Sequence, residues 1–293
     1  MANAVGRRRR SAFMAGIATM AMAIGFTAIP AEAAPPPPHV DLVAIGDSYT
    51  AGTGAGDFDP PSSACLQTDG GYVDVLDSEP IVGVVANAAC HGALLKTEAQ
   101  PGITSVMDQI AQLTGSEALS GRTELVTLTA GANDVGVNTV LYYCATFAAE
   151  VCQQAVGGAV QMMPSVGANL TQALVAIHRA APRAKIAVLG YPRLFDPTGL
   201  PVMPPENQIL VNQGTALLNA TIAASVARAN ALYRANAQFI NVTARFAGHE
   251  ANSPDAWIVL GSTPQGFHPN ETGHEQYAAA LTAAVNLASI ARR

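Results

Sequence analysis

Charged side chains are scarce in this sequence, and basic ones are scarcer still. Of its 293 residues only 12% are Asp, Glu, Lys or Arg, whereas 49% are hydrophobic. This composition excludes a disordered chain, because it supplies enough apolar surface for a large core. Lys and Arg together number 15 against 21 Asp and Glu, so no basic surface for phosphates is expected. We therefore expect a globular protein without a nucleic-acid partner.

Motifs of several common cofactor and metal sites are also missing. The four Cys contain no C-x-x-C pair, and we expect no bound metal. The glycine-rich residues 52–56 depart from the dinucleotide pattern G-x-G-x-x-G at Asp57, and no P-loop Lys follows them. The G-x-S-x-G elbow of the α/β-hydrolases is absent as well. The sequence thus predicts a protein without a metal or an organic cofactor.

The N-terminus carries the pattern of an export signal. Four consecutive Arg at 7–10 precede an uncharged apolar stretch at 11–29, and Ala-Glu-Ala at 31–33 is a small-x-small cleavage pattern. The alternative is an uncleaved anchor, because the apolar stretch is nearly long enough to span a bilayer. The proline run that follows favours cleavage. Part of the basic region resembles a twin-arginine signal, so both export routes are compatible with it.

Cleavage after Ala33 defines the expected organisation of the chain. Residues 1–33 are the signal peptide, 34–39 a Pro-rich leader, and 40–293 a single domain without internal repeats. We expect a secreted protein with no membrane span after cleavage, since no other stretch of spanning length is free of charges and turn residues. The mature chain keeps 11 basic and 20 acidic residues.

Four Cys in an exported chain imply two disulfides, because the protein meets oxidising conditions. Three pairings are possible. Closeness in the sequence favours Cys65–Cys90 and Cys144–Cys152. Each would stabilise the fold by about 2–4 kcal/mol.

Short apolar runs alternate along the chain with stretches of helical periodicity. This alternation predicts an α/β fold in which helices cover both faces of a parallel sheet. The expected strands are Asp41–Ile45, Ile81–Ala86, Glu124–Ala130, Lys185–Leu189 and Gln238–Val242. The expected helical regions are 103–113, a region that ends near 181 and includes a Cys144–Cys152 loop, 206–236, and a last helix to the C-terminus.

Polar residues directly follow three of the expected strands. Gly46-Asp47-Ser48 follows the first strand, His91-Gly92 the second and Asn133-Asp134 the third, while His268 precedes the last helix. Because the carboxyl ends of parallel strands share one edge, these groups can converge there. A Ser nucleophile needs a base such as His, and the oxyanion it creates needs a backbone N–H and an amide. The pattern therefore predicts nucleophilic catalysis by a serine.

The four motifs, in this order, resemble those of the SGNH (GDSL-type) hydrolase family, in particular its secreted actinobacterial esterases and lipases. The resemblance covers the mature domain, with blocks at 46–49, 87–93, 131–134 and 268–274. It implies a three-layer, flavodoxin-like sandwich with a five-stranded parallel sheet, and hydrolysis of carboxylic esters.

The resemblance also assigns roles to the site residues. Ser48 is the nucleophile and His268 the general base and acid. The backbone N–H groups of Ser48 and Gly92 and the side-chain amide of Asn133 form the oxyanion hole. The disulfide positions match those of the secreted members.

One position departs from the family pattern. The family usually carries Asp three residues before the catalytic His, and this chain has Gln265 there. A neutral amide cannot stabilise an imidazolium as a carboxylate does. Either the backbone carbonyl of Gln265 accepts the Nδ1–H of His268, giving a Ser–His dyad, or Asp255 or Glu250 reaches the ring. We expect the carbonyl, since a backbone acceptor also fixes the tautomer.

Other polar residues near the motifs are expected to have lesser roles. Asp47 and Asp134 are interpreted as structural residues that bond nearby backbone or cap a helix. His274 is expected on a helix surface, because its spacing from His268 is not that of a metal pair. His91 is expected at the mouth of the site.

The sequence therefore predicts a secreted, monomeric serine esterase or lipase that cleaves small-molecule or lipid esters. Apolar stretches around 141–147 and 200–203 favour acyl chains. A carbohydrate or cell-wall O-deacetylase is the alternative within the same chemistry. A surface-binding module that has lost catalysis is the alternative outside it.

Overall fold

The centre of the computed structural model is a five-stranded parallel sheet with the strand order β2-β1-β3-β4-β5. The structure describes residues 37–58, 64–97 and 101–292, so the expected signal peptide lies outside the described residues. The strands are β1 (Val40–Gly46), β2 (Val82–Asn87), β3 (Leu125–Thr129), β4 (Lys185–Leu189) and β5 (Ala237–Ile240). The predicted parallel sheet is confirmed, with strand ends that shift by a few residues.

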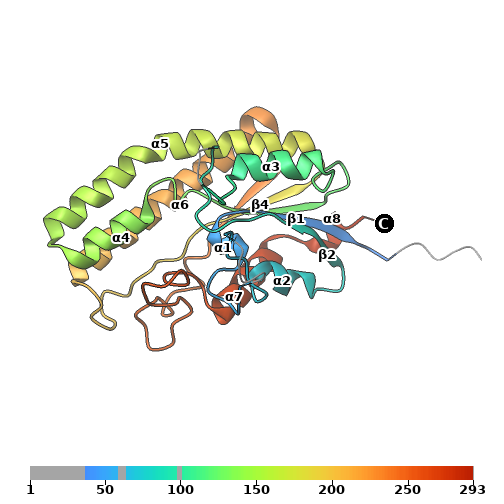
Figure 1. The fold of residues 1–293 in the computed structure, drawn as a ribbon. Helices are drawn as coiled ribbons and strands as arrows, with labels where there is room; N and C mark the ends of the chain where they lie inside the picture. Colours follow the sequence, from blue (N-terminus) through green and yellow to red (C-terminus); the bar gives the residue numbers. More distant parts are fainter. Residues whose placement is uncertain (1–36, 59–63, 98–100, 293) are drawn as a thin grey trace, which may run out of the picture. The chain divides into compact units, whose positions relative to one another are not determined.

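Helices cover both faces of this sheet and complete three layers (Figure 1). One face carries α3 (Val106–Gly115), α5 (Ala149–Ala180) and α6 (Pro205–Tyr233). The other face carries α2 (Tyr72–Asp77) and α7 (Glu271–Ala284). The remaining helices are the short α1 (Ser48–Ala51), which follows β1 directly, α4 (Val137–Thr146), which packs against α5 and α6, and α8 (Leu287–Ile290). The predicted three-layer α/β class is confirmed.

The central strands are apolar throughout because helices bury both of their faces. Every residue of β3 is buried, and in β1 only Asp41 is partly exposed. A parallel strand between two helical layers shows no alternation of polar and apolar residues. The edge strand β2 has several partly exposed residues, as its position at the border of the sheet explains.

The helix α6 is, within the described part of the chain, the one helix long and apolar enough to cross a membrane. The expectation that no other stretch of spanning length is free of charges and turn residues is compatible with this helix, which contains Glu206, Gly214 and Arg228. A core helix of a globular domain can have the same length and composition. Because α6 lies along α5 and buries Leu218, Ile222 and Val226, we interpret it as a core helix (Figure 1).

A buried carboxylate joins the carboxyl ends of three strands. Asp47 follows β1 and is only 1% exposed. It accepts hydrogen bonds from the hydroxyl of Thr129 at the end of β3 (2.6 Å) and from the hydroxyl of Tyr191, just after β4. It also accepts the backbone N–H of Tyr49 (3.1 Å). Burial raises the pKa of Asp47, whereas these donors lower it. Asp47 is thus structural, as expected, but its partners lie far away in the sequence as well as nearby.

Both expected disulfides are present. Cys65–Cys90 joins the loop after α1 to the segment that follows β2, across 25 positions of the sequence. Cys144–Cys152 spans 8 positions and joins α4 to α5. The predicted loop between these two Cys is a sharp corner between helices, since α4 ends at Thr146 and α5 begins at Ala149.

Replacing the Asp47 carboxylate by an amide is expected to destabilise the fold. The amide of Asp47→Asn would turn an NH₂ group toward buried donors, leaving at least one of them without an acceptor. We expect the free energy of unfolding to fall by about 2–3 kcal/mol in urea titrations at neutral pH. The exposed Asp57→Asn is the control and should change it by less than about 0.5 kcal/mol. Equal stability of the two variants would contradict the structural role of Asp47.

Removing either disulfide is expected to lower stability through the entropy of the unfolded chain. Because Cys65–Cys90 closes the longer loop, its Cys→Ser pair should cost about 3.5 kcal/mol, against about 2.5 kcal/mol for the Cys144–Cys152 pair. Guanidinium titrations of both double variants measure this. A larger loss for the shorter loop would show that packing at the α4–α5 corner outweighs loop closure.

Candidate active site

Ser48 is the first residue of α1, directly beyond the end of β1. The strand ends at Gly46, where a Cβ would lie 2.4 Å from the backbone oxygen of Thr129 and where φ is +143°. Only glycine fits this close approach to β3. The side chain of Gln109 holds Gly46 by accepting its N–H (2.8 Å) and donating to its carbonyl (2.9 Å). The position of Ser48 is therefore determined by the fixed end of β1 and by Asp47, whose carboxylate caps α1.

His268 lies next to Ser48, as predicted. Its Nε2 is 2.7 Å from the Ser48 Oγ, and Ser48 is only 6% exposed. The loop that carries His268 is tied to the nucleophile helix, because the hydroxyl of Tyr49 donates to the backbone carbonyl of Phe267 (2.7 Å). This pair has the geometry in which an imidazole can remove a hydroxyl proton.

The other ring nitrogen of His268 lacks a partner among the described residues, where no acceptor forms a hydrogen bond with its Nδ1. The Gln265 carbonyl accepts the backbone N–H of His268 (3.2 Å) and makes no hydrogen bond of regular geometry to Nδ1, yet the backbone of Gln265 and Gly266 lies near enough to the ring to act on its pKa. The Gln265 carbonyl as the partner of Nδ1 therefore stays a prediction. Asp255 contacts His249 (3.2 Å), and Glu250 accepts from nearby Gly248 and Ser253, so neither carboxylate pairs with His268.

Burial keeps His268 uncharged. Desolvation, and next the nearby His91, lower the pKa of His268 to about 3, while the backbone of Gly266 and Gln265 acts to raise it. An imidazole with this pKa is neutral at neutral pH and has a free lone pair. The ring can therefore accept a proton from Ser48, but its lowered pKa makes it a weaker base than a free imidazole.

The three expected oxyanion donors each keep an N–H that no described residue accepts. Asn133 lines the cavity at Ser48, and one hydrogen of its amide is held by the Ala93 carbonyl (3.1 Å), which leaves the second free. Gly92 adopts φ +80°, a conformation that favours glycine. Within the described chain, the backbone N–H groups of Ser48 and Gly92 make no hydrogen bond. Three donors are thus available for a developing negative charge.

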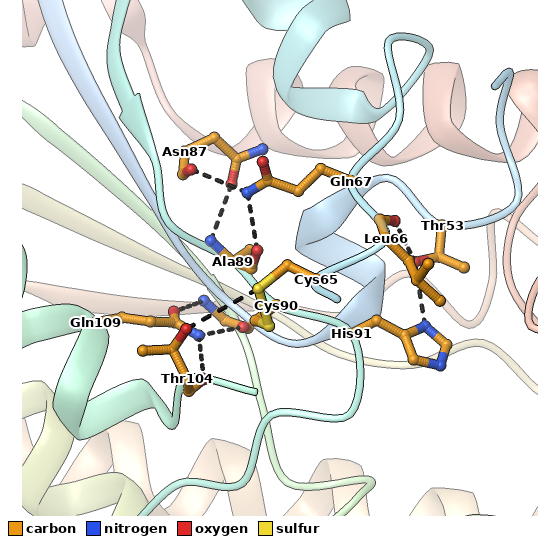
Figure 2. Close-up of a disulfide and its surroundings, with 11 residues drawn as sticks. Thr53, Cys65, Leu66, Gln67, Asn87, Ala89, Cys90, His91, Thr104 and Gln109 are labelled. Atoms are coloured by element: carbon orange, nitrogen blue, oxygen red, sulfur yellow. Dashed lines mark hydrogen bonds between the residues drawn. A yellow bond between two sulfur atoms is a disulfide. The ribbon is translucent and has the colours of Figure 1, made fainter. Parts of the chain in front are cut away.

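The segment just before Gly92 is held by a disulfide and by hydrogen bonds from Gln67, which Figure 2 shows. The Cys65–Cys90 disulfide lies two residues before Gly92, and the backbone N–H of His91 donates to the Cys65 carbonyl (2.9 Å). The side chain of Gln67 donates to the carbonyls of Asn87 (3.0 Å) and Ala89 (2.9 Å).

The turn that carries Asn133 is tied to this loop in the same way. Asp134 accepts the backbone N–H of Leu95, which lies three residues after Gly92. The interpretation of Asp134 as a stabilising residue agrees with this contact.

His91 lines the cavity, as expected. Its Nδ1 lies 3.3 Å from the Thr53 hydroxyl, and its ring centroid is 5.2 Å from that of His268 (Figure 2 shows the Thr53 contact). Burial lowers the pKa of His91, and the Asp47 carboxylate acts to raise it. The site thus holds two neutral imidazoles side by side.

The prediction that His274 lies on a helix surface is wrong. His274 is fully buried on the inner side of α7. Its Nδ1 accepts the backbone N–H of Tyr72 (3.2 Å), and its Nε2 contacts the carbonyl of Thr53 (3.2 Å). Burial lowers its pKa to about 4. His274 therefore joins α7 to α2 and to the loop after α1, and this role requires the neutral ring.

A cavity of about 830 Å³ opens beside Ser48 and His268. Its walls are mostly apolar and come from α4, α6 and the segment before His268; they include Leu141, Tyr142, Leu218, Leu260 and Phe267. Among the described residues, no group of three or more His, Cys, Asp or Glu could hold a metal ion. The arrangement suits attack by a serine on a substrate with an apolar portion.

Several site residues could not be identified from the sequence. Gln109, Tyr49, Tyr191 and Gln67 act through hydrogen bonds to residues far away in the chain. A fixed spacing to the catalytic motifs exists only for Tyr49, which directly follows Ser48.

Comparison with known proteins agrees with this geometry. The model of the GDSL-like lipase/acylhydrolase family matches residues 44–276, a range that includes all four motifs. A lipase of Streptomyces rimosus is 29% identical over 275 residues, which cover 92% of this chain and 95% of that protein.

Two solved structures share the fold over their whole length. The extracellular lipase from Streptomyces rimosus has a TM-score of 0.72 at 28% identity, and phospholipase A1 from Streptomyces albidoflavus NA297 has 0.72 at 26%. Each match covers 84% of this chain and 100% of the other. The chain belongs to the GDSL-like lipase/acylhydrolase family, and with it to the carboxylic ester hydrolases.

Proposed function

We propose that this protein is an exported serine hydrolase that cleaves the acyl esters of lipids through a Ser–His dyad. The contact of 2.7 Å between Ser48 Oγ and His268 Nε2, beside three free hydrogen-bond donors, carries the proposal. No other pair of hydroxyl and imidazole in the described chain is placed in this way beside the cavity.

The first half-reaction forms an acyl-enzyme. His268 Nε2 accepts the Ser48 proton as Oγ bonds to the ester carbonyl carbon, and the carbonyl oxygen becomes an oxyanion. The N–H groups of Ser48 and Gly92 and the amide of Asn133 stabilise that oxyanion. When the ester C–O bond breaks, the proton on Nε2 goes to the leaving alcohol.

The second half-reaction restores the enzyme. A water molecule gives a proton to Nε2 and attacks the acyl carbon. The bond to Oγ then breaks, Ser48 regains the proton, and the carboxylic acid leaves. The imidazolium that forms in each half has no carboxylate partner, and the backbone at 265–266 is the nearby group that favours the charged ring. We therefore propose a dyad rather than a triad.

The apolar cavity walls favour lipid esters over sugar esters. Side chains such as Leu141, Leu218 and Leu260 offer surface to an acyl chain but few hydrogen bonds to a sugar. The similar proteins are a lipase and a phospholipase A1, which supports the same choice. A carbohydrate O-deacetylase is less well supported by these walls, and a module without catalysis is at odds with the paired Ser48 and His268.

Export is supported by the two disulfides, which form in oxidising compartments, and by the signal-like residues 1–33. The similar lipase from Streptomyces rimosus is described as extracellular. We propose that cleavage after residue 33 releases the single domain.

Replacing Ser48 tests the nucleophile. In Ser48→Ala we expect kcat on p-nitrophenyl esters to fall by at least about a thousandfold, because no other group can form the acyl-enzyme. The control is Ser262→Ala, in the wall of the same cavity, which should change kcat by less than about fivefold. Full activity in Ser48→Ala would contradict the mechanism.

The length of the acyl chain tests the substrate class. Each buried methylene contributes about 0.8 kcal/mol, so kcat/KM should rise from acetyl toward medium-chain p-nitrophenyl esters. A series from acetyl to palmitoyl measures this. A maximum at acetyl, with no gain from longer chains, would favour the deacetylase.

The pH profile tests the burial of the base. His268 acts only when unprotonated, so activity is lost as the pH falls through its pKa. Because burial and His91 lower that pKa to about 3, the acidic limb of kcat/KM should lie well below pH 6.5 while the protein stays folded. In His91→Asn the repulsion between the two protonated rings disappears, so the pKa of His268 rises and the acidic limb should move to higher pH.

The control is His249→Asn, because His249 does not contact His268. A shift of the acidic limb in this control alone would contradict the assignment.

A further inference from the structure

Three aromatic rings are exposed together at the corner between α4 and α5. Tyr142, Tyr143 and Phe147, here called the aromatic corner, are 60%, 38% and 41% exposed. Their ring centroids are 5.5 to 6.2 Å apart, so each ring contacts the other two. A contiguous apolar group on a surface costs free energy in water and commonly marks a binding surface.

The corner is held rigidly in this exposed arrangement. The Cys144–Cys152 disulfide joins the two helices just behind the rings. The buried amide of Asn207, on α6, donates to the backbone carbonyls of Cys144 (2.7 Å) and Phe147 (3.0 Å). These bonds and the disulfide fix the backbone that carries the rings. Their exposure is thus built into the fold.

The surface around the aromatic corner has almost no charge. The sequence has no Asp, Glu, Lys or Arg at 135–149, at 151–178 or at 207–227, which include nearly all of α4, α5 and α6 up to Arg228. The exceptions near the corner are Glu150 and Glu206, both exposed and both acidic. Because these ranges contain no Lys or Arg, the corner has no basic side chain that would attract an anionic surface.

The aromatic corner is continuous with the active-site cavity. Tyr142 belongs to both, and Val137, Leu141 and Ala145 of the same helix also line the cavity. Figure 1 shows that α4 runs beside α5 and the first part of α6, beyond the edge of the sheet. A surface that covers the rings therefore lies next to the opening that leads to Ser48.

We propose that the aromatic corner docks on a zwitterionic or uncharged lipid surface and places the cavity opening against it. Tyr and Phe rings suit the boundary between headgroups and acyl chains, because each Tyr presents an apolar body and a polar hydroxyl. The proposal rests on the proposed function, because docking would serve the hydrolysis of lipid esters. The docking itself can be measured without catalysis.

A second copy of the chain is a less suitable occupant. The three rings together expose on the order of 300 Å² of side-chain surface, given about 150–250 Å² for a whole aromatic side chain. A stable protein interface buries about 800 Å² on each partner. A lipid surface needs no matching shape, and a few rings are enough to hold a protein on it.

Binding to vesicles tests the proposal. The native protein is mixed with vesicles of diether phosphatidylcholine, which contain no ester to cleave, and the bound fraction is measured by sedimentation. Compared with the native chain, Tyr143→Ser/Phe147→Ser should bind at least about tenfold more weakly. These two residues do not line the cavity, so hydrolysis of soluble p-nitrophenyl acetate should stay within about twofold.

The matched control is Leu232→Ser/Tyr233→Ser at the opposite end of α6. These side chains are 61% and 46% exposed, as much as those at the corner, and should contribute less than about twofold to binding. Added phosphatidylglycerol should not strengthen binding, because the corner lacks basic residues. As a check that does not depend on a destabilising change, the fluorescence of Phe147→Trp should shift to shorter wavelength on adding vesicles.

Three results would overturn the proposal. They are equal vesicle binding by the native chain and the corner variant, an unshifted Phe147→Trp spectrum, and a native dimer that the corner variant converts to a monomer. Failure of the proposed function has a different signature, since Ser48→Ala would then keep its ester hydrolysis while binding to the diether vesicles still depended on the corner.

Discussion

The buried carboxylate of Asp47 is the interaction on which the active site depends. A carboxylate removed from water is unfavourable unless hydrogen bonds replace its hydration. Here the hydroxyls of Thr129 and Tyr191 and the N–H of Tyr49 replace that hydration. These donors lie beyond or at the carboxyl ends of three different strands, β3, β4 and β1. The need to satisfy one charge therefore aligns the ends of β1, β3 and β4. Ser48, the next residue, takes its position from that alignment.

His268 differs from Asp47, because its surroundings favour the uncharged form of the side chain. His268 has no carboxylate beside Nδ1 in the described chain, and its burial together with His91 favours the uncharged ring. A neutral imidazole accepts a proton readily only if the resulting charge is short-lived or is met by the oxyanion it accompanies. In the proposed mechanism the donors of Gly92 and Asn133 stabilise that oxyanion, so the two charges of the intermediate form close together. The proposed dyad would thus depend on the oxyanion hole more than a triad does.

The sheet and the main motifs could be predicted, because each rests on a local pattern and one general rule. Apolar runs predicted the strands, and the shared edge of parallel strands predicted that the groups after them converge. The burial of His274 could not be predicted, because in the Ala-rich α7 the pattern does not show which side faces the core. The roles of Gln109 and Asn207 could not be predicted either, because their hydrogen-bond partners are backbone groups 60 or 63 positions away in the sequence. The sequence predicts the backbone around Gln265 as the group that faces His268 Nδ1, but it cannot predict how the carbonyls there are oriented, because that orientation is a property of the folded loop.

The Cys65–Cys90 bridge behind the Gly92 loop has a consequence for where the protein can act. An oxyanion hole that is assembled in advance uses no substrate binding energy for its own ordering. Here part of that ordering comes from a covalent bond that forms only outside a reducing compartment. A chain still in the cytoplasm would hold the loop less firmly and would be a poorer catalyst. Under the proposed function, oxidation would act as a maturation step that keeps the cleavage of lipid esters away from the membranes of the cell that makes the protein.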